Sequence, residues 1–371
     1  MSPSSSTPVD VAERVLRLLD EGRYTATYKQ AVLVALIDLS LESLEHSGAP
    51  REMVTTKQLA EKIVQLYWPH TRVWSFGEEG RVLVQNAAGS GATRDRGGGI
   101  VAKIRGFREA AEAAGAPMGT SLATARSLAP EAHRRLVDEV EWTLIEMPLP
   151  KLQRIGERNT EWLYAIAWRD VGERDPAHRA KPGVSEGQVR AYQRGAPSDF
   201  DNRIHLRPGV GEAFVRLHAM LRPFILQHWV AQVERLNRLD RQDLFGFLFG
   251  QGREDTSPIR RPLVELQAGR CFYCDGVFGD EVHVDHFVPW ARHPEQGLYN
   301  LVATDARCNG AKKDYLASVV HVERWRRRAR ESREALEQIG RAQRWDSGEE
   351  RVLGVARSIY LSQPEEMLLW R

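Results

Sequence analysis

The amino-acid sequence predicts an α+β protein with a mainly helical N-terminal region and a small C-terminal module that contains strands. Apolar residues recur at helical spacing over most of the first 140 residues, and aromatic and β-branched residues become dense after them. All three cysteines fall between Cys271 and Cys308, at a spacing typical of metal sites. We therefore expect three domains: a helical domain over residues 1–140, a region of strands, loops and a long helix over 141–250, and the module over 251–371.

The composition limits the class of protein. The chain has 371 residues, 42% of them hydrophobic, which is enough for true cores. Its net charge of +2 means that any basic surface must be local. An odd number of cysteines at metal-type spacing argues against a secreted disulfide scaffold. We expect a cytoplasmic protein, because the start MSPSSSTPVD lacks the regions of a signal peptide and Asp38 interrupts the longest apolar run.

Three helices are expected in the first 70 residues. Apolar positions from Val9 to Leu19 fit a helix period, and Tyr28–Leu44 is apolar on most faces, so this second helix should be buried. Thr55 or Thr56 is a candidate N-cap for the third helix, which Pro69 should end. The last two helices could form a helix-turn-helix DNA reader or part of a small helical bundle. The bundle is favoured, because nothing defines a recognition helix.

A glycine-rich segment, Asn86–Gly99, separates these helices from the next two, which we expect at Ile100–Ala114 and Pro130–Val140. The segment lacks the Gly-Lys-Ser/Thr ending of a phosphate-binding P-loop. It is therefore interpreted as a surface loop or wing. The alternative is a contact with a nucleic-acid backbone through Arg94 and Arg96, since glycines permit close approach.

The character of the chain changes after residue 140. Trp142–Met147 and Trp162–Trp168 are rich in aromatic and β-branched residues and are predicted to be strands. Residues 170–202 are polar and rich in Gly, Pro and Arg, which indicates a long loop. His205–Leu239 has the longest helical pattern, and Pro223 should kink that helix.

The cysteines indicate a zinc knuckle. Cys271 and Cys274 stand in a Cys-x-x-Cys motif, in which a tight turn lets two thiolates reach one tetrahedral ion. Cys308 can supply a third ligand from the far side of the module. The alternative is that the thiols are only buried small hydrophobic groups. A zinc ion here would be structural, because it would tie distant segments of a small module together.

Four short motifs follow one another between Cys271 and Lys312. The Cys-x-x-Cys motif comes first, an Asp-His pair ends a predicted strand, an Asn-Leu pair follows, and Cys-Asn-x-x-Lys is last. Each motif is uninformative alone, but their order and spacing together resemble the HNH (His-Me finger) endonuclease module. The resemblance implies a ββα-metal fold for the last third of the chain and does not extend to the rest.

The resemblance assigns chemistry to individual residues. Phosphodiester hydrolysis needs an activated water and a hard Lewis acid on the phosphate. Histidine is suited to take a proton near neutral pH, and the oxygens of Asp and Asn suit Mg²⁺. By position, the resemblance implies that Asp285 and Asn309 hold Mg²⁺ or Mn²⁺ and that His286 activates water. It also implies that Asn300 braces the loop and orients the histidine, and that Lys312 contacts phosphate. Asp305 would join Cys271, Cys274 and Cys308 in binding structural Zn²⁺.

Two points depart from a simple match. Many relatives carry a second Cys-x-x-Cys where this chain has Asp305-x-x-Cys, and Asp is a less common zinc ligand. Neighbouring residues on a strand point to opposite faces, so Asp285 and His286 share one site only if the strand ends or twists before Pro289. His283 lies on the same strand and is interpreted as structural rather than as a ligand.

A basic helix is predicted over His321–Trp345. Several arginines follow one another in its first turns, and Glu residues partly offset their charge. Arg326, Arg327 and Arg330 are candidates for phosphate contacts beside the active site, because unspecific DNA affinity comes chiefly from Arg and Lys. The alternative is a solvated amphipathic helix.

The resemblance implies a Mg²⁺-dependent endonuclease that hydrolyses double-stranded DNA. Bacterial restriction or anti-phage defence is the expected role, with residues 1–250 selecting the substrate or sensing a trigger, and the protein as a homodimer or with a partner of the same system. This role is inferred by analogy. The competing hypothesis is a subunit without catalytic turnover that binds nucleic acid or supports assembly and is stabilised by zinc.

Overall fold

The computed structural model describes residues 6–21, 25–44, 48–76, 79–87, 99–155, 158–169, 181–239, 244–250, 254–363 and 367–371. It separates into two compact units, one formed by Met1–Ser40 with Ala49–Gln251 and the other by Leu41–Gly48 with Gly252–Arg371. The second unit therefore contains nearly all of the module predicted over residues 251–371. The division of the first part at residue 140 stays a prediction. No helix among the described residues is long and apolar enough to cross a membrane.

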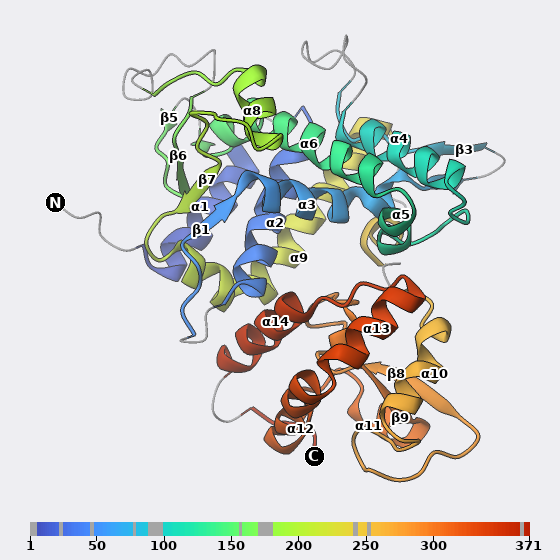
Figure 1. Ribbon diagram of the computed structural model, residues 1–371. Helices are drawn as coiled ribbons and strands as arrows, with labels where there is room; N and C mark the ends of the chain where they lie inside the picture. The colour runs from blue at the N-terminus through green and yellow to red at the C-terminus, as the bar shows by residue number, and fades with distance from the viewer. Residues whose placement is uncertain are drawn as a thin grey trace. The chain divides into compact units, whose positions relative to one another are not determined.

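The elements of the first unit are mostly helices, with short strands between them. In chain order they are α1 (Pro8–Glu21), α2 (Tyr28–Glu42), β1 (Met53–Thr55), α3 (Thr56–Tyr67), η1 (Trp68–Thr71), β2 (Val73–Phe76), β3 (Glu79–Val82), α4 (Ile100–Ala113), α5 (Leu122–Leu128), α6 (Pro130–Glu146), η2 (Leu149–Lys151), β4 (Arg154–Ile155), β5 (Arg158–Asn159), β6 (Tyr164–Ile166), α8 (Glu186–Gln193), β7 (Arg203–Leu206), α9 (Val210–Asn237) and η3 (Gly246–Gly250) (Figure 1).

The predicted helices of the first 140 residues are confirmed, and with the small sheets they make the α+β class that the sequence indicated. Residues 31–37 of α2 are fully buried, as expected of a helix without a polar face. Thr55 is the N-cap of α3, where its side chain accepts from the backbone N–H of Gln58 and the Gln58 side chain accepts from Thr55 N–H in return. Pro69 lies in the 3₁₀ turn η1 that ends this helix.

The link between α2 and α3 favours the helical bundle over a helix-turn-helix. It runs over residues 43–55 and contains β1, which pairs antiparallel with β7 in the three-stranded sheet β1-β7-β6. A helix-turn-helix joins its helices through a turn of only about 3–4 residues. Of the glycine-rich segment Asn86–Gly99, residues 88–98, including Arg94 and Arg96, lie outside the described residues.

Three expectations for residues 141–250 were wrong in whole or in part. Trp142–Met147 is not a strand, because α6 continues to Glu146 and buries Val140, Leu144 and Ile145 at helical spacing, so tertiary packing outweighs strand propensity. Residues 170–202 contain the helix α8, which a Ser185–Gln188 capping box begins. Residues 170–180 lie outside the described residues.

The long helix begins later than expected. Residues 203–206 form the central strand β7, so α9 starts at Val210 and continues through Pro223 to Asn237. Of the segment Trp162–Trp168, the structure assigns Tyr164–Ile166 to β6, which confirms a strand there.

His70 lies at the centre of an aromatic cluster in the first unit. Its ring is fully buried against Tyr67, Trp229 and Phe249, at centroid distances of 5.4, 5.1 and 5.0 Å. Burial lowers the pKa of His70 from 6.5 to about 3, because the charged ring would lose its hydration in this setting. The neutral ring is therefore the form compatible with the fold.

We expect the stability of the first unit to fall in acid because of His70. The unfolded chain takes up a proton below about pH 6.5 and the native ring only near pH 3, so the unfolded state binds more protons between these values. Between pH 7.5 and 5.5, the wild-type free energy of unfolding should fall by about 1.4 kcal/mol more than that of His70→Phe. Denaturant unfolding followed by tryptophan fluorescence measures this difference. Equal pH dependence in both proteins would show that His70 titrates normally.

The second unit is built around one β-hairpin and the helix that follows it. Its elements are α10 (Ser257–Leu266), β8 (Val282–His286), η4 (Leu298–Asn300), β9 (Leu301–Asp305), α11 (Ala306–Lys312), α12 (Val319–Glu331), α13 (Arg333–Gln343) and α14 (Glu349–Leu361) (Figure 1). The helix α11 packs on both strands, α10 on the same hairpin, and α13 and α14 on η4. The single helix predicted over residues 321–345 is two helices, which meet at Ser332.

Candidate active site and metal-binding cluster

The hairpin sets the direction of the predicted site residues. In the antiparallel pair, Asp285 stands opposite Val302 and His286 opposite Leu301. Side chains two apart on a strand share a face, so His283 and Asp285 point to one side and His286 to the other. The helix α11 begins directly after β9 and packs on β8, and both Asn309 and Lys312 contact residues of β8.

Asp285 is held by two side chains from other parts of the module. The Lys312 ammonium lies 2.9 Å from Asp285 Oδ2, and the Tyr273 hydroxyl donates to the same oxygen at 2.7 Å. Both contacts use Oδ2, and among the described residues no hydrogen bond is donated to Oδ1. Asp285 is therefore fixed in orientation while one carboxylate oxygen keeps its capacity to bind a cation.

Lys312 lies inside the module rather than at its surface. Its side chain is fully buried, and its ammonium also donates to the His286 backbone carbonyl at 2.9 Å. Burial lowers the pKa of Lys312, an effect that the nearby Asp285 carboxylate opposes. A phosphate contact by Lys312 would require these bonds to be broken, so the geometry favours a role in positioning Asp285 and the end of β8.

Asn309 contacts His283, which the sequence did not mark as a ligand. Its side-chain amide nitrogen lies 3.0 Å from His283 Nδ1. The other ring nitrogen, Nε2, lies 2.8 Å from a carboxylate oxygen of Glu281. The strand β8 and the helix α11 therefore bring together His283, Asp285 and Asn309, although no hydrogen bond joins Asp285 to Asn309 within the described residues 254–363.

His286 faces the loop that connects the two strands. Its Nε2 lies 3.1 Å from the side-chain oxygen of Gln296, and its ring packs edge-on against Trp290 with centroids 5.4 Å apart. The side chain is largely buried, and both of these contacts are with the loop rather than with Asp285 or Asn309. The alternation expected of strand neighbours thus persists at the end of β8. Lys312 links the two sides, through Asp285 and the His286 carbonyl.

Asn300 braces the connecting loop. Its side chain is fully buried and accepts from Val288 N–H at 2.8 Å, while its amide group donates to the carbonyls of Val288 and Glu295, each at 3.1 Å. The Phe287 N–H donates to the Asn300 backbone carbonyl at 2.7 Å. These bonds fix the loop immediately after His286, so Asn300 can act on the histidine only through the backbone.

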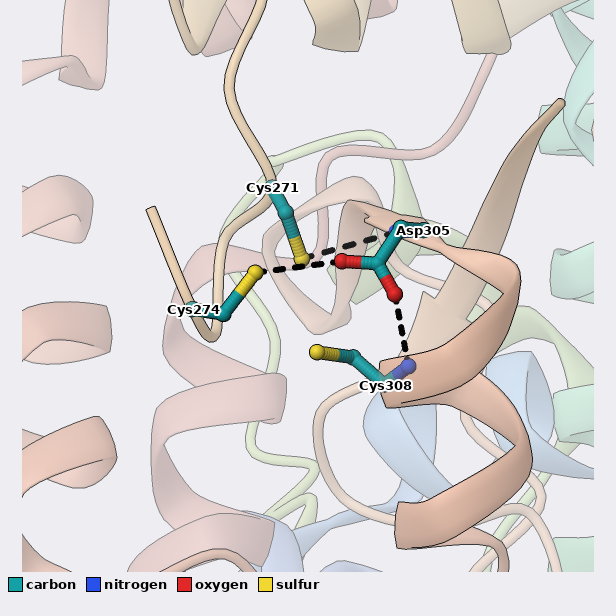
Figure 2. A group of neighbouring side chains, drawn as sticks. All are labelled: Cys271, Cys274, Asp305 and Cys308. Atoms are coloured by element: carbon teal, nitrogen blue, oxygen red, sulfur yellow. Dashed lines mark hydrogen bonds between the residues drawn. The ribbon is translucent and has the colours of Figure 1, made fainter. Parts of the chain in front are cut away.

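Three cysteines and an aspartate lie close together at the other end of the hairpin. Figure 2 shows Cys271, Cys274, Asp305 and Cys308 pointing toward one another, and their ligand atoms all lie within 4.8 Å of one another. Cys274 Sγ lies 3.1 Å from Asp305 Oδ2, and Cys308 N–H donates to Asp305 Oδ1 at 2.7 Å. Three thiols and one carboxylate at this spacing fit a tetrahedral metal ion, and Asp305 is at the same time the N-cap of α11.

The electrostatics of this cluster also fit a cation. Burial and the neighbouring Asp305 carboxylate raise the pKa of the Cys308 thiol well above its usual range. Burial alone would raise the pKa of Asp305, but hydrogen bonds from Cys308 N–H and from the thiols outweigh it and lower that pKa. The Asp305 carboxylate thus raises the pKa of Cys274 and of Cys308 and disfavours their ionisation. A divalent cation at the centre would reverse this preference and favour the thiolates.

A second group of possible ligands lies in the same unit, beside an arginine. Glu42, His293 and Glu295 offer ligand atoms within 4.8 Å of one another. The Glu295 carboxylate, however, forms a two-point ion pair with Arg351 at 2.7 and 2.8 Å. The Glu295 carboxylate is therefore already engaged by a cation from the protein.

The basic helix α12 divides its arginines between two faces. Arg324 donates to the backbone carbonyls of Phe272 and Tyr273 in the cysteine turn, and Arg328 donates to that of Leu301 in β9 at 2.9 Å, so both hold the module together. The arginines predicted to contact phosphate lie on the exposed side. Together with one acidic neighbour they line a surface hollow formed by Glu323, Arg326, Arg327 and Arg330.

Sequence reasoning missed several residues of this site. Tyr273 occupies a variable position of the Cys-x-x-Cys motif and Gln296 lies outside the motifs, so nothing in the spacing indicated that they contact Asp285 and His286. The alternation Glu281-x-His283-x-Asp285 on one strand was a usable signal, because it places three candidate ligands or ligand supports on one face.

Comparison with known proteins shows which family the C-terminal module resembles. Residues 270–318 match the family model described as HNH endonuclease, which confirms the resemblance noted in the sequence. The match covers the cysteine cluster, the hairpin and α11, and no family matches the N-terminal region. No curated protein and no solved structure matches the chain.

Proposed function

We propose that the protein is a metal-dependent HNH endonuclease that hydrolyses phosphodiester bonds of double-stranded DNA. The observation that carries this proposal is the HNH endonuclease match over residues 270–318, within which the hairpin and α11 present Asp285, His286 and Asn309. The match indicates a nuclease. The substrate, the metals and the roles of the residues are our proposals.

The catalytic cation would be held by Asp285 and Asn309. Oxygen donors from a carboxylate and an amide suit Mg²⁺ or Mn²⁺, and such an ion supplies charge stabilisation for the phosphate and the leaving oxygen. Lys312 and Tyr273 hold the carboxylate of Asp285 through Oδ2, which leaves Oδ1 to face the ion. Lys312 thus acts as a positioning residue in this proposal.

His286 would act as the general base that takes the proton from the attacking water, which requires the scissile phosphate to lie at the end of β8, between the side that carries Asp285 and the side that carries His286. The Nε2 of His286 lies 3.1 Å from the Gln296 side-chain oxygen, and a neutral imidazole is suited to accept a proton. Asn300 would hold the loop after His286 and so keep the ring in place. The cluster of Cys271, Cys274, Asp305 and Cys308 would bind a structural Zn²⁺ that is distinct from the catalytic ion.

A role in bacterial restriction or anti-phage defence is proposed by analogy, with the first unit selecting the DNA or sensing a trigger. Plasmid nicking tests the activity itself. We expect purified full-length protein to nick or linearise supercoiled plasmid with Mg²⁺ or Mn²⁺, and EDTA to stop the reaction. Plasmid binding without cleavage under any of these ions would instead favour a zinc-stabilised nucleic-acid-binding subunit.

The exposed arginines of α12 provide a test of the substrate path. Replacing Arg326, Arg327 and Arg330 with Gln should weaken binding to all DNA sequences alike, because interactions with phosphate carry no sequence information. The slope of log affinity against log salt should flatten by about 0.9 for each phosphate that the variant no longer neutralises.

The matched control replaces Arg260, Arg261 and Arg341, which are exposed in the same unit, with Gln. The control removes the same charge but should change the salt slope much less. Equal slopes for the wild type and for the α12 variant would mean that this face of the helix is only solvated.

A further inference from the structure

We propose that His283 is a third ligand of the catalytic cation, so that the ion is held by one nitrogen and two oxygen donors. This inference rests on the proposed function for the cation and on Asp285 and Asn309 as its ligands. It adds a residue that precedes the Asp-His pair by two positions and that none of the four motifs contains.

Strand geometry places His283 on the correct side. His283 and Asp285 are two residues apart on β8, so their side chains leave the same face of the hairpin. The helix α11 lies over this face, with Lys312 against Asp285 and Asn309 against His283. His286 leaves the opposite face toward Gln296. A cation that binds Asp285 and Asn309 therefore has His283 as its histidine neighbour.

The contact between His283 and Asn309 defines the donor atom. The Nδ1 of His283 lies 3.0 Å from the Asn309 amide nitrogen, and an N–H donor there requires a lone pair on Nδ1. A half-turn of the amide group presents Asn309 Oδ1 to the same place. With a cation present, Nδ1 and Oδ1 would both face the ion, and the hydrogen bond between the two side chains would be exchanged for two metal bonds.

Glu281 provides the support that metal-bound histidines usually have. A histidine that binds a metal through one nitrogen commonly donates its other N–H to a carboxylate, which fixes the ring and its tautomer. The Nε2 of His283 lies 2.8 Å from Glu281 Oε1. The order Glu281–His283–cation thus reproduces a carboxylate–histidine–metal arrangement. Since the His283 side chain is 34% exposed, the cation can reach it from solvent.

The added nitrogen predicts a metal preference. Imidazole suits transition metals, whereas Mg²⁺ prefers oxygen donors and retains its waters. We therefore expect Mn²⁺ to bind more tightly than Mg²⁺ at this site. The difference between the two affinities should become smaller in His283→Gln, which lacks the imidazole ring. The cysteine cluster does not compete for Mn²⁺ in protein loaded with zinc, because thiolates select softer ions.

Electron spin-echo spectroscopy of Mn²⁺ tests the ligand directly. Full-length, zinc-loaded protein with one equivalent of Mn²⁺ should show the ¹⁴N coupling of a directly bound imidazole. The coupling should disappear in His283→Gln and persist in His286→Ala, which removes the other histidine of the same strand. Coupling that is absent in the wild type, or that survives in His283→Gln, would overturn the proposal.

Glu281 gives a second readout through affinity. Removal of such a supporting group commonly weakens metal binding by about 10–100-fold, so Glu281→Ala should raise the Mn²⁺ dissociation constant by at least about 10-fold. Asp280→Ala is the matched control, because it removes the same charge from the adjacent exposed position. Equal losses in the two variants would mean that Glu281 acts only by its charge and would count against the arrangement.

The two proposals fail in different ways. If the protein nicks plasmid but its bound Mn²⁺ shows no nitrogen coupling, the nuclease function is supported and His283 is rejected as a ligand. Nitrogen coupling that depends on His283, in a protein that cleaves no plasmid with any cation, would support the ligand set and reject the nuclease.

Discussion

Replacing His286 with alanine should lower the rate of plasmid cleavage by about 10²–10⁴-fold, the usual contribution of a general base. The effect should be confined to turnover. His286 leaves β8 on the side away from Asp285 and Asn309, and its ring contacts Gln296 and Trp290 in the connecting loop. The alanine variant should therefore keep its catalytic-site Mn²⁺ affinity and its DNA affinity.

Three measurements separate this role from a structural one. DNA binding in EDTA, where we expect no hydrolysis, should match the wild type. Zinc content should also match, because the cysteine cluster lies at the other end of the hairpin, and a cooperative thermal transition should show that the variant is folded. Added imidazole should restore part of the rate, since it can occupy the vacated volume and accept a proton. A variant that cleaves at the wild-type rate would show that His286 is not the base.

Gln296 should influence the same reaction through the orientation of the ring. It contacts His286 Nε2 and belongs to the loop that Asn300 braces. The sequence predicted roles for His286 and Asn300 because both stand in short motifs with a defined order. It could not identify Gln296, because the path of a loop that returns to the strand end is decided by its hydrogen bonds and not by spacing.

In the rest of the module too, motif spacing predicted which residues lie near one another but not how their side chains are buried. Motif spacing indicated that Asp285, Asn309 and Lys312 lie near one another, because a hairpin followed at once by a helix leaves little other choice. It did not indicate that Lys312 would be buried, since an isolated Lys near a helix end is usually solvated. Burial depended on Asp285 and Tyr273, which come from two other segments of the chain.

In the first unit, the helix ends that the sequence marked with a capping residue or a proline were predicted correctly. The Thr55 cap and Pro69 set the ends of α3 as expected. Residues 142–147 were wrongly expected to be a strand, because the strand preference of Trp and Ile depends on their surroundings and the packing of α6 decided their conformation. Intrinsic propensity therefore predicted element ends better than it predicted the state of a buried segment.

Replacing Cys271 or Cys308 with serine should unfold the second unit at a much lower temperature and abolish its zinc content. Structural zinc contributes about 10–16 kcal/mol to the folding of small zinc-finger peptides, and each of these residues would supply one of four ligands. The ligands come from the turn at Cys271, from the end of β9 and from α11, so their loss would separate three segments. The catalytic variants Asp285→Ala and Asn309→Ala should lose activity but retain zinc.

Asp305 allows the ligand role to be separated from the helix cap. Asn is as good an N-cap as Asp, so Asp305→Asn should keep the bond from Cys308 N–H while losing the anionic ligand. Asp305→Ala loses both. If Asp305 binds zinc, Asn should already lower zinc retention against a chelator, and Ala should add only the cost of a missing cap, about 1 kcal/mol of unfolding free energy. Zinc retention equal to that of the wild type in Asp305→Asn would remove Asp305 from the site. Elemental analysis that finds no zinc in wild-type protein purified without chelator would show that the cysteines are only packed.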